Sequence, residues 1–116
     1  MNVESFREYC LSKKNTTESF PFDTDTLVFK VADKLFALIS LSKPDRCNLK
    51  CEPAYAIQLR SEYGGIEPGY HMNKQHWNTV YFNADVPDSL IYALTDHSYE
   101  QVVLKLPVKI RKELGY

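Results

Sequence analysis

Apolar residues alternate with other residues along two neighbouring stretches in the first half of the chain. Residues 27–31 (LVFKV) and 35–41 (LFALISL) are rich in the β-branched and aromatic side chains that strands favour. Residues 32–34 (ADK) lie between them and suit a short hairpin turn. Residues 47–51 (CNLKC) alternate in the same way, with Leu49 and the two cysteines on one face. These stretches predict three consecutive antiparallel strands.

A spacing of three and four residues predicts the first helix. Phe6 and Cys10 lie on one apolar stripe, and Asn2 can cap the segment, so the helix is expected from Asn2 through Lys14. Residues 15–25 are rich in Thr, Asp and Pro and predict a loop.

Further helices follow the third strand. Residues 53–65 begin with a proline, end with a glycine pair and predict a second helix. Pro87 is expected to open a short helix. Residues 98–101 (SYEQ) match a capping box and predict that a separate helix begins at Ser98, which Pro107 then interrupts.

The element order predicts the fold class. The order α-βββ-α-ββ-αα implies an α+β protein with a single antiparallel sheet of about five strands and helices mainly on one face. At 116 residues the chain is expected to form one domain, residues 1–116.

Composition sets limits on the class of protein. A hydrophobic fraction of 44% excludes disorder, and no apolar run is long enough to predict a membrane helix. The first ten residues, MNVESFREYC, lack a secretory signal, so a cytoplasmic location is expected. The three cysteines are Cys10, Cys47 and Cys51. Cα atoms four residues apart in a strand lie about 13 Å apart, too far for a disulfide, so reduced and mostly buried thiols are expected.

Charge is balanced overall and uneven along the chain. The 14 basic and 15 acidic residues give a net charge of −1, which argues against strong electrostatic binding of nucleic acid. Residues 27–51, however, contain five basic residues and two acids, and residues 101–116 contain four basic residues and one acid. A basic surface on a neutral protein therefore remains open.

Residues 68–80 (PGYHMNKQHWNTV) are unusually dense in polar and aromatic side chains. A hairpin turn at Asn73-Lys74 would place His71 opposite His76, Tyr70 opposite Trp77, and Lys74 at the tip. The alternative is one continuous strand, in which the two histidines point to opposite faces.

The histidines of this segment suggest two functions, metal binding and catalysis. His71 and His76, with Cys47 or Cys51, could bind a metal, but their spacing is not that of a helical zinc site, so a metal-free histidine pair is favoured. The same histidines with Lys74 could act in acid–base catalysis, yet no carboxylate within the segment orients them. No nucleophile elbow or phosphate-binding glycine motif is present, so neither a cofactor nor an enzymatic activity is expected.

Nucleic-acid contact fits the same hairpin. Lysines can meet phosphates, amides can meet base edges, and exposed aromatic rings can stack on bases. The candidate residues are Lys30, Lys34, Lys50, Tyr70, His71, Asn73, Lys74, His76 and Trp77. The competing interpretation is that Tyr70 and Trp77 only pack the core or its rim.

Several segments in their order along the chain resemble the MmcQ/YjbR family. They are PFD (21–23), LVFKV (27–31), LFAL (35–38), CNLKCEP (47–53), EPGYHMNKQHWNTV (67–80) and SYEQVVLKLP (98–107). The resemblance implies a two-layer sandwich similar to that of CyaY and frataxin. The family is described as DNA-binding, with a double wing made of two β-hairpins. By that resemblance the wings here are Leu27–Leu41 and Pro68–Phe82.

One departure from the family affects the expected site. Ala32-Asp33 stands where members often have a glycine-rich turn, and an acid there would weaken phosphate contact, so the second wing is favoured. Frataxin metal chemistry does not transfer, because the first helix has only Glu4 and Glu8 as acids. The sequence therefore predicts a DNA partner bound with little sequence specificity, by a monomer or weak homodimer. The alternative is a small-molecule or protein-binding module that uses the 68–82 hairpin.

Overall fold

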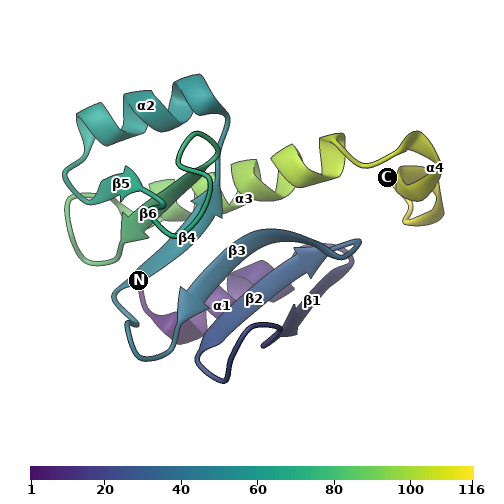
Figure 1. Ribbon diagram of the computed structural model, residues 1–116, viewed down its shortest axis with the longest axis horizontal. Coiled ribbons are helices and arrows are strands. Elements are labelled where there is room, and N and C mark those ends of the chain that lie inside the picture. The colour runs from purple at the N-terminus through teal and green to yellow at the C-terminus, as the bar shows by residue number, and fades with distance from the viewer.

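A six-stranded antiparallel sheet forms one layer of the protein and helices form the other (Figure 1). The structure is a computed structural model that describes residues 1–116. The helices are α1 (Val3–Leu11), α2 (Pro53–Glu62), α3 (Asp88–Leu104) and α4 (Val108–Glu113). The strands are β1 (Thr16–Ser19), β2 (Thr26–Val31), β3 (Lys34–Ser40), β4 (Arg46–Lys50), β5 (Ile66–Pro68) and β6 (Trp77–Tyr81). Their spatial order is β1-β2-β3-β4-β6-β5.

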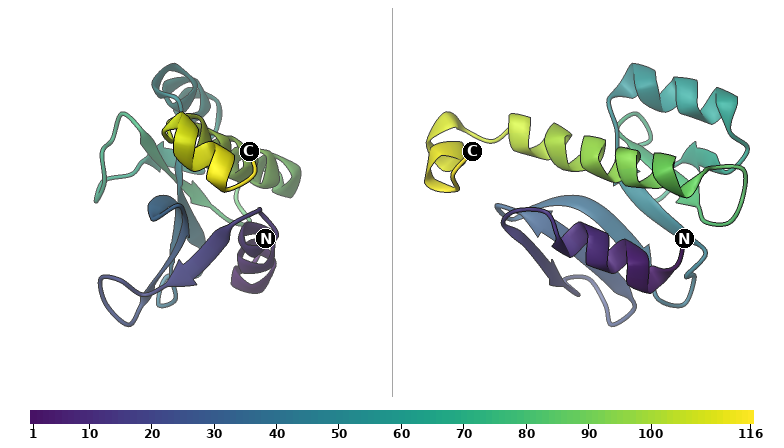
Figure 2. Two further views of the ribbon diagram at one scale, coloured as in Figure 1. Left: turned by 90° about the vertical axis from the view of Figure 1, so that its right-hand side faces the viewer. Right: turned by 180° about the vertical axis from the view of Figure 1, so that it is seen from behind.

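The main core lies between the sheet and the helices α1, α2 and α3. Phe6 of α1, Leu59 of α2 and Ile91 of α3 are buried in one cluster with the apolar residues of the sheet. Figure 2 shows α1 and α3 on the same side of the sheet. The opposite side has no helix over it, and we call it the helix-free face. The predicted fold class, with helices mainly on one face, is confirmed.

The β2–β3 hairpin forms as the sequence predicts. Ala32 and Asp33 both have positive φ angles, 50° and 63°, which is the geometry of a two-residue turn that matches the twist of the strands. Phe29 pairs with Ala37 whereas Lys30 pairs with Leu35, so β3 has a bulge at Phe36. Asn2 also caps α1 as predicted, because its Oδ1 accepts a hydrogen bond from the backbone N of Ser5 (2.8 Å).

Strand β1 corrects the predicted loop at residues 15–25 and brings the sheet to six strands. Its sequence, TTES, has no apolar alternation, so nothing in its pattern indicated a strand. It forms by pairing with β2, from Thr16 opposite Val31 to Ser19 opposite Val28. Arg7 of α1 donates two hydrogen bonds to the Glu18 carboxylate, at 2.7 and 2.5 Å, and ties the strand to the helix layer.

Helix α3 is continuous over 17 residues, so the predicted break and new helix at Ser98 are wrong. The side chain of Ser98 is fully buried in the middle of this helix. Its Oγ donates to the carbonyl of Phe36 (2.5 Å) and accepts from the backbone N of Lys50 (2.8 Å). The hydroxyl therefore hydrogen-bonds to the backbone of the sheet and does not cap a helix.

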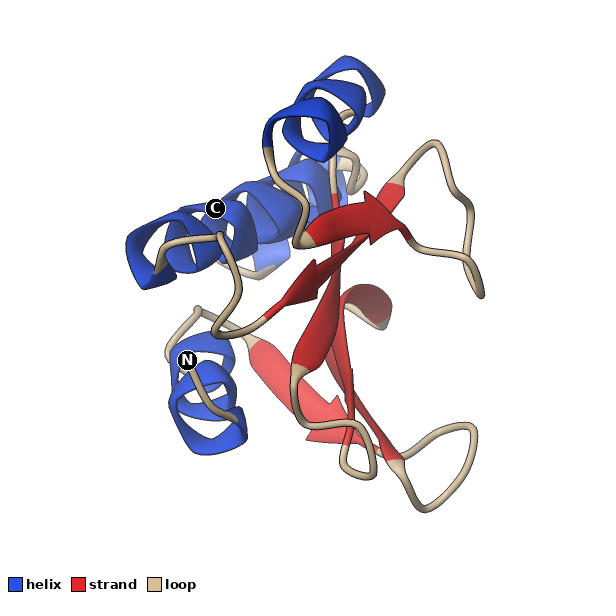
Figure 3. Cartoon of the chain, turned by 90° about the vertical axis from the view of Figure 1, so that its left-hand side faces the viewer, coloured by secondary structure: helices blue, strands red, loops and turns tan.

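The sheet divides where β3 and β4 meet. Only two residue pairs join these strands, Ala37 with Leu49 and Leu38 with Asn48. Beyond them the strands diverge, as the red strands in Figure 3 show, and Ser98 bridges the backbone groups that no longer pair with each other. Helix α3 thus fastens the two halves of the sheet from the helix side.

The cysteines and the helix lengths agree with two further expectations. All three cysteines are free and buried, which confirms the expected reduced thiols. No helix has both the length and the apolar composition needed to cross a membrane.

Candidate functional site

The second hairpin is shorter and more open than predicted. Strand β5 pairs with β6 from Ile66 opposite Val80 to Pro68 opposite Asn78, and the backbone N of Gly69 donates to the carbonyl of Trp77 (2.9 Å). A Cβ atom at Gly69 would lie 3.0 Å from that of Trp77, so glycine permits this close approach. Residues 69–76 then leave the sheet as a loop, which we call the 69–76 loop.

This register overturns two predicted pairings. His71 does not face His76 and Tyr70 does not face Trp77, because regular pairing ends before these residues and the register differs by one position. The alternative of one continuous strand is also wrong. Asn73 does shape the turn, since its Oδ1 accepts a hydrogen bond from the backbone N of Gln75 (2.9 Å).

The two aromatic residues of the segment have different environments. Trp77 is only 8% exposed and packs with Val28 and Leu38 in a small apolar cluster on the helix-free face. Its ring is therefore not available for stacking on a base, and for this residue the packing interpretation holds. Tyr70 is 59% exposed, and the Lys74 ammonium lies 5.3 Å from the centre of its ring.

The helix-free face lies between two projecting loops. The left panel of Figure 2 shows the 69–76 loop and the 20–25 loop extending from the sheet on the side opposite to α1 and α3. Alternation along the strands places Lys30 of β2 and Lys50 of β4 on this face, together with Asn48. Lys34, at the start of β3, is exposed beside the first hairpin turn.

The lysines of this region lack acidic partners. The ion pairs of the protein are Met1–Asp88, Arg7–Glu18, Lys13–Asp96 and Arg46–Asp45, and none includes a candidate lysine. Partial burial lowers the pKa of Lys50, and the ammonium groups of Lys105 and Lys34 lower it further. Lys34 and Lys105 are thus the charged neighbours of Lys50, and none of the three forms an ion pair; we call them the lysine cluster (Lys34, Lys50, Lys105).

The histidines do not come together in a metal site. His71 is exposed on the 69–76 loop, and His76 is half-buried next to β6. No group of three or more histidine, cysteine, aspartate or glutamate side chains is placed to hold a metal ion.

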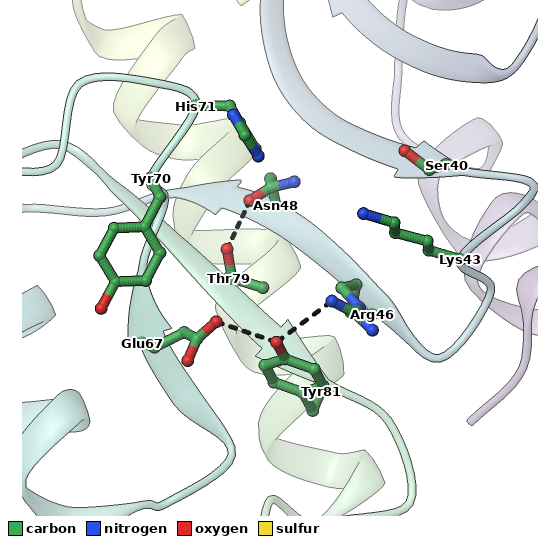
Figure 4. A pocket seen from close by; sticks show the side chains of 9 residues that line it. All are labelled: Ser40, Lys43, Arg46, Asn48, Glu67, Tyr70, His71, Thr79 and Tyr81. Carbon is green, nitrogen blue, oxygen red and sulfur yellow. Dashed lines mark hydrogen bonds between the residues drawn. The ribbon is translucent and has the colours of Figure 1, made fainter.

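A small polar pocket opens on the helix-free face (Figure 4). Its volume is about 140 Å³, and strands β4 and β6 form its floor. The lining residues are Ser40, Lys43, Arg46, Asn48, Glu67, Tyr70, His71, Thr79 and Tyr81. Of the predicted site residues, only Tyr70 and His71 belong to it.

Hydrogen bonds organise one side of the pocket. The Arg46 guanidinium donates to the Tyr81 hydroxyl (3.2 Å), which in turn donates to the Glu67 carboxylate (2.9 Å). Arg46 also pairs with Asp45 (2.9 Å) and lies over the Tyr81 ring, 4.7 Å from its centre. The hydrogen bond to Glu67 raises the pKa of Tyr81.

Local sequence patterns contain little signal for this pocket. Arg46 and Asn48 are two residues apart in a predicted strand, so their common face could have been inferred. Tyr81 and Glu67 join them through the pairing of β4 with β6 and of β5 with β6, which no local pattern specifies.

Comparison with known proteins identifies the family. The YjbR family model matches residues 11–101. YjbR of Escherichia coli (strain K12) is 37% identical over 115 residues, which cover 98% of each chain. The chain belongs to the YjbR family. YyaQ of Bacillus subtilis (strain 168) is 34% identical over 73 residues, 63% of this chain and 61% of that protein. The family inferred from the sequence motifs is thereby confirmed.

Solved structures agree with the fold. The crystal structure of Deinococcus radiodurans protein DR2400, with the domain DUF419, has a TM-score of 0.92 and 39% identity, covering 97% of this chain and 87% of that one. The crystal structure of a Pseudomonas syringae protein, target PsR293, has a TM-score of 0.74 and 30% identity, covering 87% and 98% of the two chains. Both structures therefore share the fold of this chain.

Proposed function

We propose that this YjbR-family protein binds DNA through its helix-free face, with little sequence preference. The observation on which the proposal rests is that Lys34 and Lys50 lie without an acidic partner at the end of the sheet where both hairpins end, with Lys105 added from the C-terminal end of α3. Lys34 belongs to the first hairpin, Lys50 lies between the hairpins, and Lys74 is on the second.

Mutual repulsion within the lysine cluster favours a polyanionic ligand. Burial is the largest cause of the lowered pKa of Lys50, and repulsion from the ammonium groups of Lys105 and Lys34 adds to it. A phosphate beside these ammonium groups would offset that repulsion. A nucleic-acid backbone supplies a regular series of such phosphates and releases counterions when lysines neutralise them.

The overall charge of −1 does not oppose this proposal, because charge is distributed unevenly along the chain, with five basic residues and two acids in residues 27–51. Lys30, Lys34, Lys50 and Lys74 belong to no ion pair, so no neighbouring carboxylate neutralises their positive charges.

Low sequence preference follows from the side chains on this face. Lysines contact phosphates, which are the same for every sequence, whereas amides that hydrogen-bond base edges read sequence. Asn73 is exposed but its Oδ1 is used within the turn, and Trp77 is buried. Tyr70 remains as the exposed ring that a base can stack on.

Fluorescence anisotropy with labelled duplex and single-stranded DNA over a salt series tests the proposal. Each phosphate contact contributes about 0.9 to the slope of log K against log salt for duplex DNA. Lys50→Gln and Lys74→Gln should each reduce that slope by about one unit. Lys112→Gln is the matched control, because it removes the same charge from an exposed site on α4.

Two results would refute the proposal. One is the absence of binding to either form of DNA at low salt. The other is an equal loss of affinity in Lys50→Gln and Lys112→Gln, because binding would then depend on overall charge and not on the helix-free face.

A further inference from the structure

The polar pocket on the helix-free face has one side whose groups are already paired. The Arg46 guanidinium, the Tyr81 hydroxyl and the Glu67 carboxylate form a connected series of hydrogen bonds, and Asp45 pairs with Arg46 as well. The charges of this side therefore largely cancel, and Glu67 is engaged with Tyr81. A ligand would gain little by contacting these groups.

The other side of the pocket presents hydrogen-bond donors with no partner. Lys43 Nζ makes no ion pair and no hydrogen bond, and the Ser40 hydroxyl and His71 imidazole make none either. The Asn48 amide accepts from the Thr79 hydroxyl (2.8 Å) through Oδ1, which leaves its NH₂ group free to donate. Figure 4 shows Lys43, His71 and the Asn48 amide nitrogen pointing toward a common space.

Free donors that converge, one of them a permanent cation, are suited to an oxyanion. At about 140 Å³ the pocket is smaller than the roughly 300 Å³ at which pockets for drug-sized ligands begin, so it suits one small group and not a whole nucleotide. A phosphate group, with one phosphorus and four oxygens, fits both the size and the donors.

We propose that this pocket binds the terminal phosphate of a phosphomonoester. The floor is closed by Asn48 and Thr79, so a phosphate that reaches it must be the end of its molecule, whereas an internal phosphodiester continues on both sides. Tyr70 stands at the wall of the pocket with its ring 59% exposed, where it can stack on a nucleobase attached to that phosphate.

The source of this phosphate is inferred from where the pocket lies, and this step rests on the proposed function. The pocket opens on the helix-free face, which also carries Lys30 and Lys50, so the 5′-phosphate at the end of a DNA strand is the expected ligand. A free nucleoside monophosphate offers the same chemistry and is the second source that the experiment separates.

The test compares two oligonucleotides of one sequence, one with a 5′-phosphate and one with a 5′-hydroxyl, by fluorescence anisotropy. The phosphorylated oligonucleotide should bind at least about tenfold more tightly, as expected for charge-assisted hydrogen bonds. Asn48→Asp should abolish that preference, because it replaces the donor NH₂ with a repelling carboxylate while an oxygen can still accept from Thr79. Lys43→Gln should reduce the preference.

Lys50→Gln is the control that distinguishes the pocket from the lysine cluster. It should weaken binding of both oligonucleotides equally and leave the preference for the phosphate intact. Circular dichroism and thermal melting check that Asn48→Asp is folded, and Asn48→Ala replaces it if it is not.

Each outcome bears on one of the two proposals. Equal affinities for the two oligonucleotides would overturn the pocket inference and leave the proposed function standing. If neither binds, the proposed function fails, and the pocket is then tested by titrating adenosine 5′-monophosphate while recording the side-chain amide resonance of Asn48. Saturable shifts of that resonance that Lys43→Gln reduces would identify a free nucleotide as the ligand. Absence of shifts would overturn the inference.

Discussion

Removing the hydroxyl of Ser98 should destabilise the protein more than a serine substitution normally does. Ser98 Oγ is buried between β3 and β4, where it donates to the Phe36 carbonyl (2.5 Å) and accepts from the Lys50 backbone N (2.8 Å). In Ser98→Ala both backbone groups lose their partner in a place where the two strands no longer pair with each other.

The magnitude follows from leaving two backbone groups unsatisfied. Each buried donor or acceptor without a partner costs about 1–3 kcal/mol, so the free energy of unfolding should fall by about 2–4 kcal/mol, allowing for partial relaxation. For 116 residues at about 2.1 cal/mol/K each, the entropy of unfolding is about 0.24 kcal/mol/K. The melting temperature should therefore fall by about 8–16 °C.

Urea denaturation followed by circular dichroism measures this change, with Ser61→Ala as the matched control. Ser61 Oγ donates to the Gln58 carbonyl (2.7 Å) at an exposed position of α2, so its removal should cost less than about 0.5 kcal/mol. Hydrogen exchange of the Lys50 amide gives a local readout and should accelerate in Ser98→Ala. A loss below about 1 kcal/mol, with the Lys50 amide still protected, would refute the bridging role.

Three further predictions concern other contacts. Burial raises the pKa of Cys51 to about 11, so its thiol should react with a disulfide reagent only as fast as the protein unfolds. Labelling of the folded protein at the rate of a solvent-exposed thiol would contradict this. The Asp85 carboxylate accepts from both backbone N atoms of Gly64–Gly65 (2.7 Å each), so Asp85→Ala should lower stability by about 1–3 kcal/mol in urea denaturation, and an unchanged midpoint would rule this out. The hydrogen bond from Arg7 lowers the pKa of Glu18, so this pair stabilises the folded state above pH about 4.3 and loses that contribution as the pH falls through the lower folded pKa. The free energy of unfolding of the natural protein should exceed that of Glu18→Gln by less than about 1 kcal/mol at neutral pH, and this difference should vanish in acid. A difference that persists in acid would exclude the ion pair as its cause.

Local patterns predicted the elements that contain their own signals. The β2–β3 hairpin has alternating apolar residues and a two-residue turn at Ala32-Asp33, and α1 has its cap at Asn2. Strand β1 was missed because TTES lacks such a pattern and depends on β2 for its formation. Ser98 resembled a helix cap because serine is favoured there, yet the same hydroxyl can satisfy backbone groups of a divided sheet.

The candidate site shows the same limit of local patterns. Residues 68–80 were expected to form a hairpin, but residues 69–76 are a loop and residues 77–80 are a buried part of β6, because the register depends on where β5 and β6 stop pairing. No local pattern distinguishes Lys43 as a site residue, because nothing near it in the sequence indicates that the 69–76 loop lies opposite. The pocket therefore emerges from four strands and two loops and could not be predicted from any one of them.

The narrow junction between β3 and β4 also bears on how the protein folds. Residues 3–40 contain α1 and β1 to β3, and residues 46–81 contain β4, α2, β5 and β6, so each half of the sheet is built from neighbours in sequence. Such local pairing forms early, whereas the core that unites the halves needs α3, which follows both halves in the chain. A chain emerging from the ribosome can thus form two half-sheets before residues 88–104 are available to join them. Pulse-labelled hydrogen exchange should show the β2–β3 amides protected before the Lys50 amide, and simultaneous protection would argue for a single nucleus.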